Sequence, residues 1–344
     1  MALLIDGGRI PPRWAEKKGL HVVRGNGRFD SGVERVEIAL INNMPDAALE
    51  DTEMQFMELL ETAAGDIPIR LKLYSLPKVP RGERGLQHLS RFYFDIDDLW
   101  NSHHDALIMT GTEPRQPDLR QESYWSALTD VLDWAERNTV STILSCLAAH
   151  AGVLHSDGIR RQPLSEKQFG VFESVRVGEH ELTRHASRPM RFPHSRWNEV
   201  REDSLTACGY AVLTKSAQAG VDLFAKQKKK SLFVHFQGHP EYGTRTLLKE
   251  YRRDVKRFLR QERETYPTMP CGYFNNAATR FLAEFRETAR AHPSEGQLTL
   301  FPEAMVVEGL QNSWHSSANS VYRNWLQYVL SRLIGRGMLV VCCN

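Results

Sequence analysis

The sequence has few cysteines, no long apolar run and almost no excess charge. Its five cysteines are irregularly spaced, and no two pairs show zinc-ligand spacing, so we expect reduced thiols and no metal site. The formal net charge of +2 over 344 residues gives no reason to expect a nucleic-acid or membrane partner. Near the N-terminus, only Ala2 to Ile5 form an apolar run, too short for a signal peptide or a membrane span. We therefore expect a cytoplasmic protein.

The order of apolar patterns predicts alternating strands and helices. Strands are expected at residues 33–42, 67–76, 105–109, 139–145 and 232–236, and helices at residues 49–63, 124–137, 250–265, 277–291 and 321–334. This alternation indicates an α/β fold with an open, mostly parallel sheet flanked by helices and ligands at the carboxyl ends of its strands.

The regions between these elements are expected to be loops. Residues 77–90 read as a long loop, residues 163–196 as a loop-rich flap or lobe over the site, and Asp46 as the N-cap of the first helix. Residues 226–230, rich in lysine, are expected to form a hairpin turn, with a patch for the phosphates of CoA as the alternative. We predict an irregular lead-in over residues 1–35, a single α/β domain over 36–334 and a tail over 335–344.

One cysteine lies where a strand is expected to turn into a helix. Thr139 to Ser145 form a β-branched, apolar run, and the residues from Leu147 onward are small and tolerate a helix. Cys146 is therefore expected at a helix N-terminus, whose partial positive charge favours the nucleophilic thiolate. A buried structural cysteine is the alternative, since free cysteines are among the most buried residues.

A glycine turn is expected on the same rim of the sheet. Residues 110–115 follow the strand that ends at Met109, and Gly111 gives this turn a permissive backbone. The backbone N–H groups of Gly111 and Leu147 are candidates for stabilising an oxyanion next to Cys146. A simple tight turn is the alternative for Gly111.

A histidine and a carboxylate follow the strand at residues 232–236. His239 and Glu241 are two residues apart, so a bend at Pro240 is needed before the carboxylate can orient the imidazole. Nucleophilic catalysis by a thiol requires a base within hydrogen-bond reach of the thiol and an acid that orients this base. The competing histidines are His235, His194, His150 and His155.

Together these motifs resemble a known family. The cysteine at a strand-to-helix turn and the later Gly-His-Pro-Glu resemble the class I glutamine amidotransferase-like (flavodoxin-like) fold. The chain is more specifically similar to the homoserine O-succinyltransferase family, through collinear motifs at Asn42–Pro45, Thr110–Gly111, Tyr124–Trp125, Ser141–Thr142, Glu166–Lys167, Gly170–Glu173, Pro193–Arg196, Gly238–Tyr242 and Asn324–Leu326.

The resemblance assigns roles to residues. It implies that Cys146 takes the acyl group as a thioester, that His239 is the general base and that Glu241 orients it. The substrate-binding residues that it implies are Lys167, Ser195, Arg253 and Glu250. An arginine suits an amino-acid carboxylate because its planar fork binds two oxygens, and a glutamate suits the ammonium group. Without the family, each of these charges reads as a solvated surface residue.

Two positions depart from the family pattern. Asp46 and Ala47 stand where the family commonly has two lysines. Arg115 stands at the position whose residue type varies with the acyl group that the family member transfers, usually Gly for succinyl and Glu for acetyl. An arginine would attract the free carboxylate of a succinyl group, and one charge-assisted contact contributes roughly 1.5 to 3 kcal/mol. We therefore expect succinyl-CoA as donor, on condition that Arg115 does not point to solvent.

The activity that the resemblance implies is transfer of a succinyl group from succinyl-CoA to the hydroxyl of L-homoserine, for methionine biosynthesis, with ping-pong kinetics. The CoA thioester is a substrate, and no cofactor is expected. No glycine-rich phosphate loop marks where CoA binds. The resemblance also implies a homodimer. The alternatives are an acetyl-CoA-dependent enzyme, a glutamine amidohydrolase, which usually has glycines beside its cysteine, and a non-catalytic binding protein.

Overall fold

The computed structural model describes residues 3–5, 9–18 and 35–335. Its larger sheet has eight strands in the order β1-β3-β2-β4-β5-β12-β11-β8. Neighbours from β1 to β12 are parallel, whereas β11 and β8 run antiparallel to their neighbours. The strands are β1 (Leu3–Ile5), β2 (Val36–Ile41), β3 (Ile69–Tyr74), β4 (Ala106–Met109), β5 (Ser141–Ser145), β8 (Ala211–Val212), β11 (Leu223–Lys228) and β12 (Ser231–Phe236). The expected open, mostly parallel sheet is confirmed.

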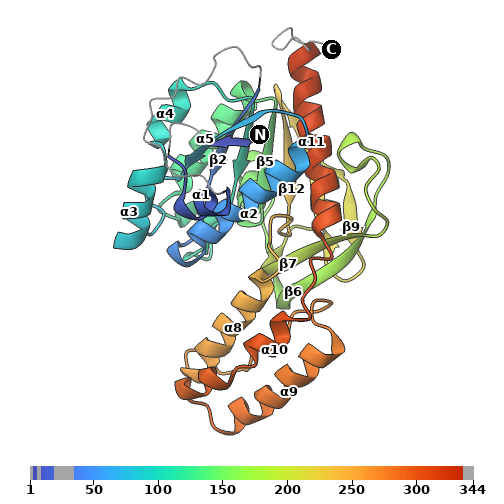
Figure 1. The fold of residues 1–344 in the computed structure, drawn as a ribbon. Coiled ribbons are helices and arrows are strands. Elements are labelled where there is room, and N and C mark those ends of the chain that lie inside the picture. The colour runs from blue at the N-terminus through green and yellow to red at the C-terminus, as the bar shows by residue number, and fades with distance from the viewer. Residues whose placement is uncertain (1–2, 6–8, 19–34, 336–344) are drawn as a thin grey trace.

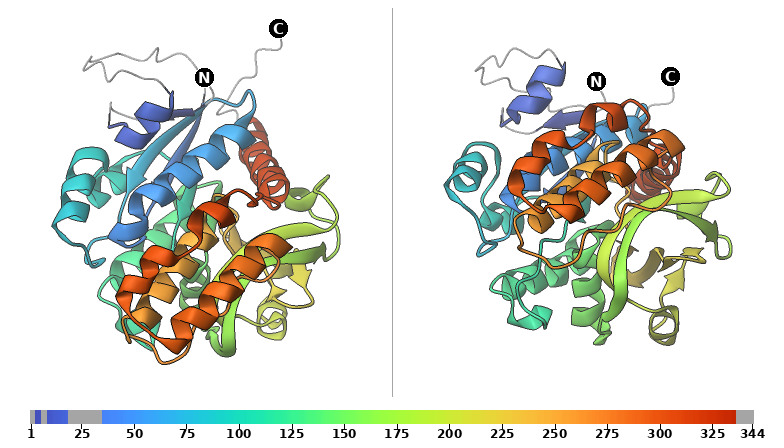
Figure 2. Two further views of the ribbon diagram at one scale, coloured as in Figure 1. Left: turned by 60° about the horizontal axis from the view of Figure 1, so that its bottom comes forward. Right: turned by 90° about the horizontal axis from the view of Figure 1, so that it is seen from below.

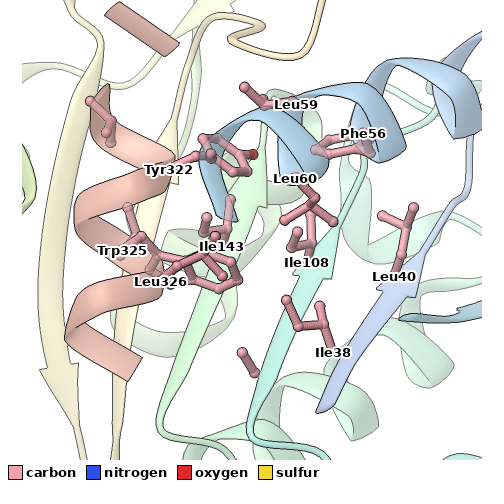
Figure 3. Packing of buried hydrophobic residues seen from close by; sticks show 14 of the residues in the cluster. Ile38, Leu40, Phe56, Leu59, Leu60, Ile108, Ile143, Tyr322, Trp325 and Leu326 are labelled. Carbon is pink, nitrogen blue, oxygen red and sulfur yellow. The ribbon is translucent and has the colours of Figure 1, made fainter. Parts of the chain in front are cut away.

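Helices cover both faces of this sheet, as buried parallel strands require. Successive residues of one strand enter opposite cores: Ile38 and Leu40 pack in one, Ala39 and Ile41 in the other. The first core holds α1 (Pro12–Lys18), α2 (Asp46–Ala64) and α11 (His315–Gly335), and the second holds α4 (Ile96–Asn101), α5 (Trp125–Asn138) and α6 (Leu147–Asp157). Figure 3 shows α2 and α11 side chains meeting the strands in the first core. None of the described helices is long and apolar enough to cross a membrane.

A second, smaller sheet and a helical group complete the molecule. The sheet has the order β10-β9-β6-β7 and consists of β6 (Gln162–Arg176), β7 (Met190–Glu199), β9 (Thr214–Ser216) and β10 (Gly220–Val221). Beyond the β6–β7 hairpin, Figures 1 and 2 show a group of helices. Their buried apolar side chains form a third core cluster together with Phe169 and Val171 of β6. These helices are α8 (Thr246–Leu259), α9 (Asn276–Ala291) and α10 (Glu303–Val307), with the short helix η4 (Glu295–Leu300). The other helices in the described part of the chain are α3 (Glu83–Phe92), α7 (Glu202–Ala207), η2 (Leu119–Gln121) and η3 (Glu181–Thr183).

Several expected loops and boundaries are wrong. The lead-in is not irregular at residues 3–5, because β1 pairs with β3 at the sheet edge, nor at residues 12–18, which form α1. Residues 83–92 form α3, in which Leu86, Leu89 and Phe92 recur every three residues, and Leu89 and Phe92 pack partly buried against the first core. Residues 163–196 are mostly the β6–β7 hairpin, whose half-exposed strands are stabilised by pairing with each other.

The start of α2 and the turn between β11 and β12 were also predicted. Asp46 is not the N-cap of α2: Pro45 holds that position, and the Asp46 carboxylate instead accepts the backbone N–H of Gly82 at 2.7 Å. The hairpin turn at residues 226–230 is confirmed, since β11 and β12 pair antiparallel from Lys228 and Ser231 onward. The predicted tail over 335–344 lies, beyond residue 335, outside the described residues.

Candidate active site

Cys146 alone joins β5 to α6. Its backbone has φ +53° and ψ −112°, a conformation that costs energy in a residue other than glycine. The N–H of Cys146 donates to the carbonyl of Phe236 at 2.8 Å, and its carbonyl accepts the N–H of Ala149 at 3.0 Å. These bonds hold the turn in place. They present the partly exposed thiol at the N-terminus of α6, where the partial positive charge of a helix stabilises an anion.

The partners of the thiol come from the segment after β12. Ser145 lies opposite Phe236 in the parallel β5–β12 pair, so both chains leave the sheet at the same edge. The Cys146 thiol acts on the imidazole of His239, and Nδ1 of His239 lies 2.9 Å from Oε1 of Glu241. The hydroxyl of Ser145 donates to the Glu241 carboxylate at 3.3 Å. The three residues predicted to be catalytic therefore lie in the order thiol, imidazole, carboxylate.

The charges around His239 favour its protonated form. Burial alone would lower the pKa of His239, because a buried imidazolium loses its hydration. The negative charges of Cys146 and Glu241, with hydrogen bonds to both side chains, outweigh burial and raise the pKa of His239 well above its usual range. The ring of Tyr242 stacks on the imidazole, with centroids 4.2 Å apart. An imidazolium beside a thiolate is the arrangement that a cysteine nucleophile uses.

A second carboxylate, that of Asp222, lies behind the loop that follows β12 and carries His239. No motif in the sequence marks it. Oδ1 of the fully buried Asp222 accepts the N–H of Gly238 at 2.7 Å, and the N–H of His239 donates to the carbonyl of Pro193 at 2.8 Å. A Cβ on Gly238 would lie 2.8 Å from that carbonyl oxygen and 2.9 Å from Asp222, so this close approach requires glycine. Burial raises the pKa of Asp222 to about 6, although the Gly238 hydrogen bond and nearby positive charges oppose the shift.

Gly111 lies against the first residue of α6. A Cβ on Gly111 would lie 2.6 Å from Cβ and 2.9 Å from the backbone nitrogen of Leu147. The prediction that the Gly111 turn and Cys146 lie next to each other is thus confirmed. The backbone N–H groups of Gly111 and Leu147 have no acceptor among the described residues. Two free N–H groups next to a nucleophile are able to receive a developing oxyanion.

The four residues predicted to bind substrate form one cluster beside His239. Glu250 on α8 is its centre: its carboxylate accepts hydrogen bonds from Ser195 and, at 2.6 Å, from the hydroxyl of Tyr242. Nζ of Lys167 lies 3.6 Å from the same carboxylate, and Arg253 lies 3.7 Å from it. Because Tyr242 also stacks on the imidazole of His239, the cluster is joined directly to the Cys146 site.

Asp254 belongs to this cluster and was missed in the sequence. Its carboxylate lies 3.0 Å from Nζ of Lys167 and accepts two hydrogen bonds from Arg253 at 3.0 Å. Burial would raise the pKa of Asp254, but the charges of these two cations lower it overall. Its position four residues after Glu250, on the same face of α8, was the available signal.

The side chain of Arg115 is not placed as predicted. The backbone N–H groups of Arg115 and Gln116 both donate to the buried carboxylate of Glu122, which turns the loop so that the Arg115 side chain is exposed. Its guanidinium has no hydrogen bond or ion pair within the part of the chain that the structure describes. The condition on which we expected Arg115 to attract a succinyl carboxylate is not met.

A cation still stands at the loop where the family has two lysines. The buried guanidinium of Arg81 donates to the carbonyl of Asn42 at 3.3 Å and to the hydroxyl of Ser75 at 3.1 Å. It also lies 3.3 Å from the carboxylate of Asp46. Arg81 and Asp46 therefore form a pair that fixes the loop before α2.

The competing histidines are placed elsewhere. Burial lowers the pKa of His150 and of His235 to about 3, and lowers that of His194 well below its usual range, so all three are neutral core residues. His155 lies beside Asp133, with 2.8 Å between ring nitrogen and carboxylate. Among the described residues, no three His, Cys, Asp or Glu side chains gather as a metal ion would need.

Fold and site together define an α/β protein with a cysteine at a strand-to-helix turn, beside a histidine and a glutamate. The family model described as homoserine O-succinyltransferase matches residues 13–335, and the chain belongs to this family. Homoserine O-succinyltransferase of Rhodopseudomonas palustris is 45% identical over 85% of this chain and 87% of its own length. That of Bradyrhizobium japonicum is 42% identical over 96% and 99%.

Among solved structures, a glutamine amidotransferase from Methylobacillus flagellatus is similar, with a TM-score of 0.45 and 11% identity, over 86% of this chain and 95% of its own. A likeness of this degree supports no conclusion about the chain, and the fold rests on the sheet order described above.

Proposed function

We propose that the protein is a homoserine O-succinyltransferase that moves a succinyl group from succinyl-CoA to the hydroxyl of L-homoserine through a thioester on Cys146. Membership of the family supports the reaction. The observation that carries the mechanism is the order Cys146, His239, Glu241, beside two backbone N–H groups that have no acceptor among the described residues. The product, O-succinyl-L-homoserine, serves methionine biosynthesis, and the reaction needs no cofactor because the CoA thioester is a substrate.

In the first half-reaction, the Cys146 thiolate attacks the thioester carbonyl of succinyl-CoA. The carbonyl oxygen becomes an oxyanion, which the N–H groups of Gly111 and Leu147 stabilise. The tetrahedral intermediate collapses, the bond to the CoA sulfur breaks, and the imidazolium of His239 gives its proton to the leaving sulfur. CoA thiol leaves, and the succinyl group stays on Cys146.

In the second half-reaction, homoserine binds in the cluster on α8. The Arg253 guanidinium is suited to its carboxylate, and Glu250 to its ammonium group. The neutral imidazole of His239 takes the proton of the homoserine hydroxyl as the oxygen attacks the thioester carbonyl. The carbon–sulfur bond breaks, the ester leaves, and the thiolate and imidazolium are restored. Glu241 orients the imidazole throughout.

Intact-protein mass spectrometry without acceptor tests this proposal. Succinyl-CoA should give a succinyl-sized adduct that homoserine discharges. The adduct should be absent in Cys146→Ser and form about 10²- to 10⁴-fold more slowly in His239→Asn. An acetyl-sized adduct from acetyl-CoA, and none from succinyl-CoA, would show that the donor is acetyl-CoA. The absence of any adduct, with release of ammonia from glutamine, would refute acyl transfer and indicate a glutamine amidohydrolase.

Two further properties are proposed from the family resemblance. We infer that the enzyme is cytoplasmic and works as a homodimer with its two small-molecule substrates. Sedimentation velocity of the purified protein tests the second point, and a single species of monomer mass at working concentration would contradict it.

A further inference from the structure

Asn43 lies in the loop after β2 and holds the residue that precedes Gly111. It is buried, with 2% of its surface exposed. Its side-chain nitrogen Nδ2 donates to the carbonyl of Thr110 at 3.1 Å, and its side-chain oxygen accepts the N–H of Leu76 at 3.0 Å. The backbone N–H of Asn43 donates to the hydroxyl of Thr110 at 2.8 Å. Asn43 therefore binds Thr110 at two points, the carbonyl and the hydroxyl.

The contact with the carbonyl orients the peptide bond between Thr110 and Gly111. A peptide unit is planar and trans, so its carbonyl oxygen and its N–H point in opposite directions. The carbonyl of Thr110 points toward the Asn43 amide that donates to it. The N–H of Gly111 belongs to the same peptide unit and therefore points away from Asn43.

The strand order shows what lies on that side. β4 lies between β2 and β5 in the sheet. Asn43 follows β2, and the N–H of Thr110 also faces β2, because it donates to the carbonyl of Ile41 at 3.0 Å. The side away from Asn43 is thus the β5 side, and Cys146 directly follows β5. The N–H of Gly111 is directed to the side of the sheet that carries the thiol.

An asparagine suits this position because its amide donates and accepts at once. The amide nitrogen donates to Thr110 while the amide oxygen accepts the N–H of Leu76, which follows β3. A carboxylate of the same shape accepts from Leu76 but, when ionised, has no hydrogen to give to Thr110. The side chain is thereby fixed between the segments that follow β3 and β4. Oyxanion stabilisation is effective when its donors are held in place beforehand, and this contact holds one of them.

We propose that Asn43 is a positioning residue that aims the N–H of Gly111 at the oxyanion formed on Cys146. The inference rests on the proposed function and adds a residue to it. Asn43 does not touch the reacting atoms and acts through the peptide between Thr110 and Gly111. When Nδ2 is lost, this peptide is free to rotate, whereas the bonds that hold Cys146 are unchanged.

The test compares two reactions of Cys146 in Asn43→Asp, which keeps the acceptor for Leu76 but places an oxygen against the Thr110 carbonyl. Adduct formation with succinyl-CoA passes through an oxyanion. Alkylation by iodoacetamide does not, because the thiolate displaces iodide from a saturated carbon. The maximal rate of adduct formation should fall by about 10- to 100-fold. The half-saturating succinyl-CoA concentration and the rate of Cys146 alkylation should stay within about twofold.

Asn138→Asp is the matched control. Nδ2 of Asn138 also donates to a backbone carbonyl, that of Trp134 at 2.8 Å, but it lies at the end of α5, before the amino end of β5. All three quantities should stay within about twofold in this variant. If Asn43→Asp does not fold, by circular dichroism, Asn43→Ala replaces it, because it removes the donor without adding a charge. The same changes are then expected.

Unchanged adduct formation in the Asn43 variant overturns the inference. An equal loss in adduct formation and alkylation also overturns it, because Asn43 would then support the thiol or the fold and not the direction of the Gly111 N–H. A wild-type protein that is alkylated at Cys146 but forms no succinyl adduct would refute the proposed function, and with it the role of Asn43.

Discussion

At the scale of single residues, the site combines strain with charge. Cys146 holds a positive φ that a non-glycine residue adopts only when its surroundings impose it. Bonds to Phe236 and Ala149 impose it here. The imidazole of His239 is buried between two anions, which explains why its pKa is raised in spite of burial. The energy stored in this turn is compensated by the strands and helix that meet there.

Asp222 gives a prediction about stability and pH. Its pKa is about 6 in the folded protein, mainly through burial, and near 3.8 when unfolded. The folded state therefore binds the proton more tightly, and stability should fall as pH rises from about 4 to 6. A shift of this size corresponds to about 3 kcal/mol as an order of magnitude. The penalty is complete only above about pH 7, where Asp222 is ionised in the folded state as well.

Urea unfolding of wild type and Asp222→Asn, at several pH values from 4 to 7, checks this. Asparagine keeps an oxygen acceptor for the N–H of Gly238 but does not titrate. The difference in unfolding free energy between the two proteins should shift in favour of the variant by about 2 to 3 kcal/mol over this range. Stability curves that stay parallel from pH 4 to 7 would show that Asp222 titrates alike in both states.

At the scale of elements, the site depends on how closely the β4 turn approaches α6. Gly111→Ala would place a methyl group 2.6 Å from Cβ of Leu147, which neither backbone can avoid without moving. The two N–H groups proposed to bind the oxyanion would separate. We expect kcat to fall by about 10²- to 10³-fold and stability to fall by about 1 to 3 kcal/mol.

Steady-state kinetics and thermal unfolding of this variant test the role of the turn. Gly296→Ala is a matched control, because a Cβ there meets its nearest atom at 4.0 Å, far from the site. It should leave both quantities within experimental error. Full activity in Gly111→Ala would mean that the turn plays no part in stabilising the oxyanion.

At the scale of the whole molecule, α11 completes a core begun by strands nearly two hundred residues earlier. Trp325 is fully buried, and its indole N–H donates to the hydroxyl of Ser141 at 2.9 Å (Figure 3 shows its packing). Trp325→Ala should destabilise the fold by about 3 to 5 kcal/mol through lost packing and the cavity left behind. Trp197, which is 54% exposed, is the control, and its change to alanine should cost no more than about 0.5 kcal/mol.

Urea unfolding followed by circular dichroism measures both variants. The midpoint should move to lower urea for Trp325→Ala with an unchanged slope, since the same surface is exposed on unfolding. Equal midpoints for the two variants would mean that α11 is not part of the cooperative core.

Predictions from sequence failed where stability comes from pairing over long distances. The β6–β7 hairpin was read as loop because its half-exposed strands lack an apolar alternation, yet the two strands bond to each other along most of their length. The helix α3, where a loop was expected, packs Leu89 and Phe92 against the first core and brings Gly85 against the Asp46 carboxylate of α2. Neither contact is visible from local spacing.

The sequence by itself determined the features that depend on neighbouring residues. These are the buried parallel strands, the turn that carries Cys146, and the two-residue spacing of His239 and Glu241. Only the folded structure shows that Arg115 is exposed and that Asp222 supports the loop that carries His239. The physical reason is that the direction and charge environment of a side chain depend on segments brought together by folding, which a linear pattern does not specify.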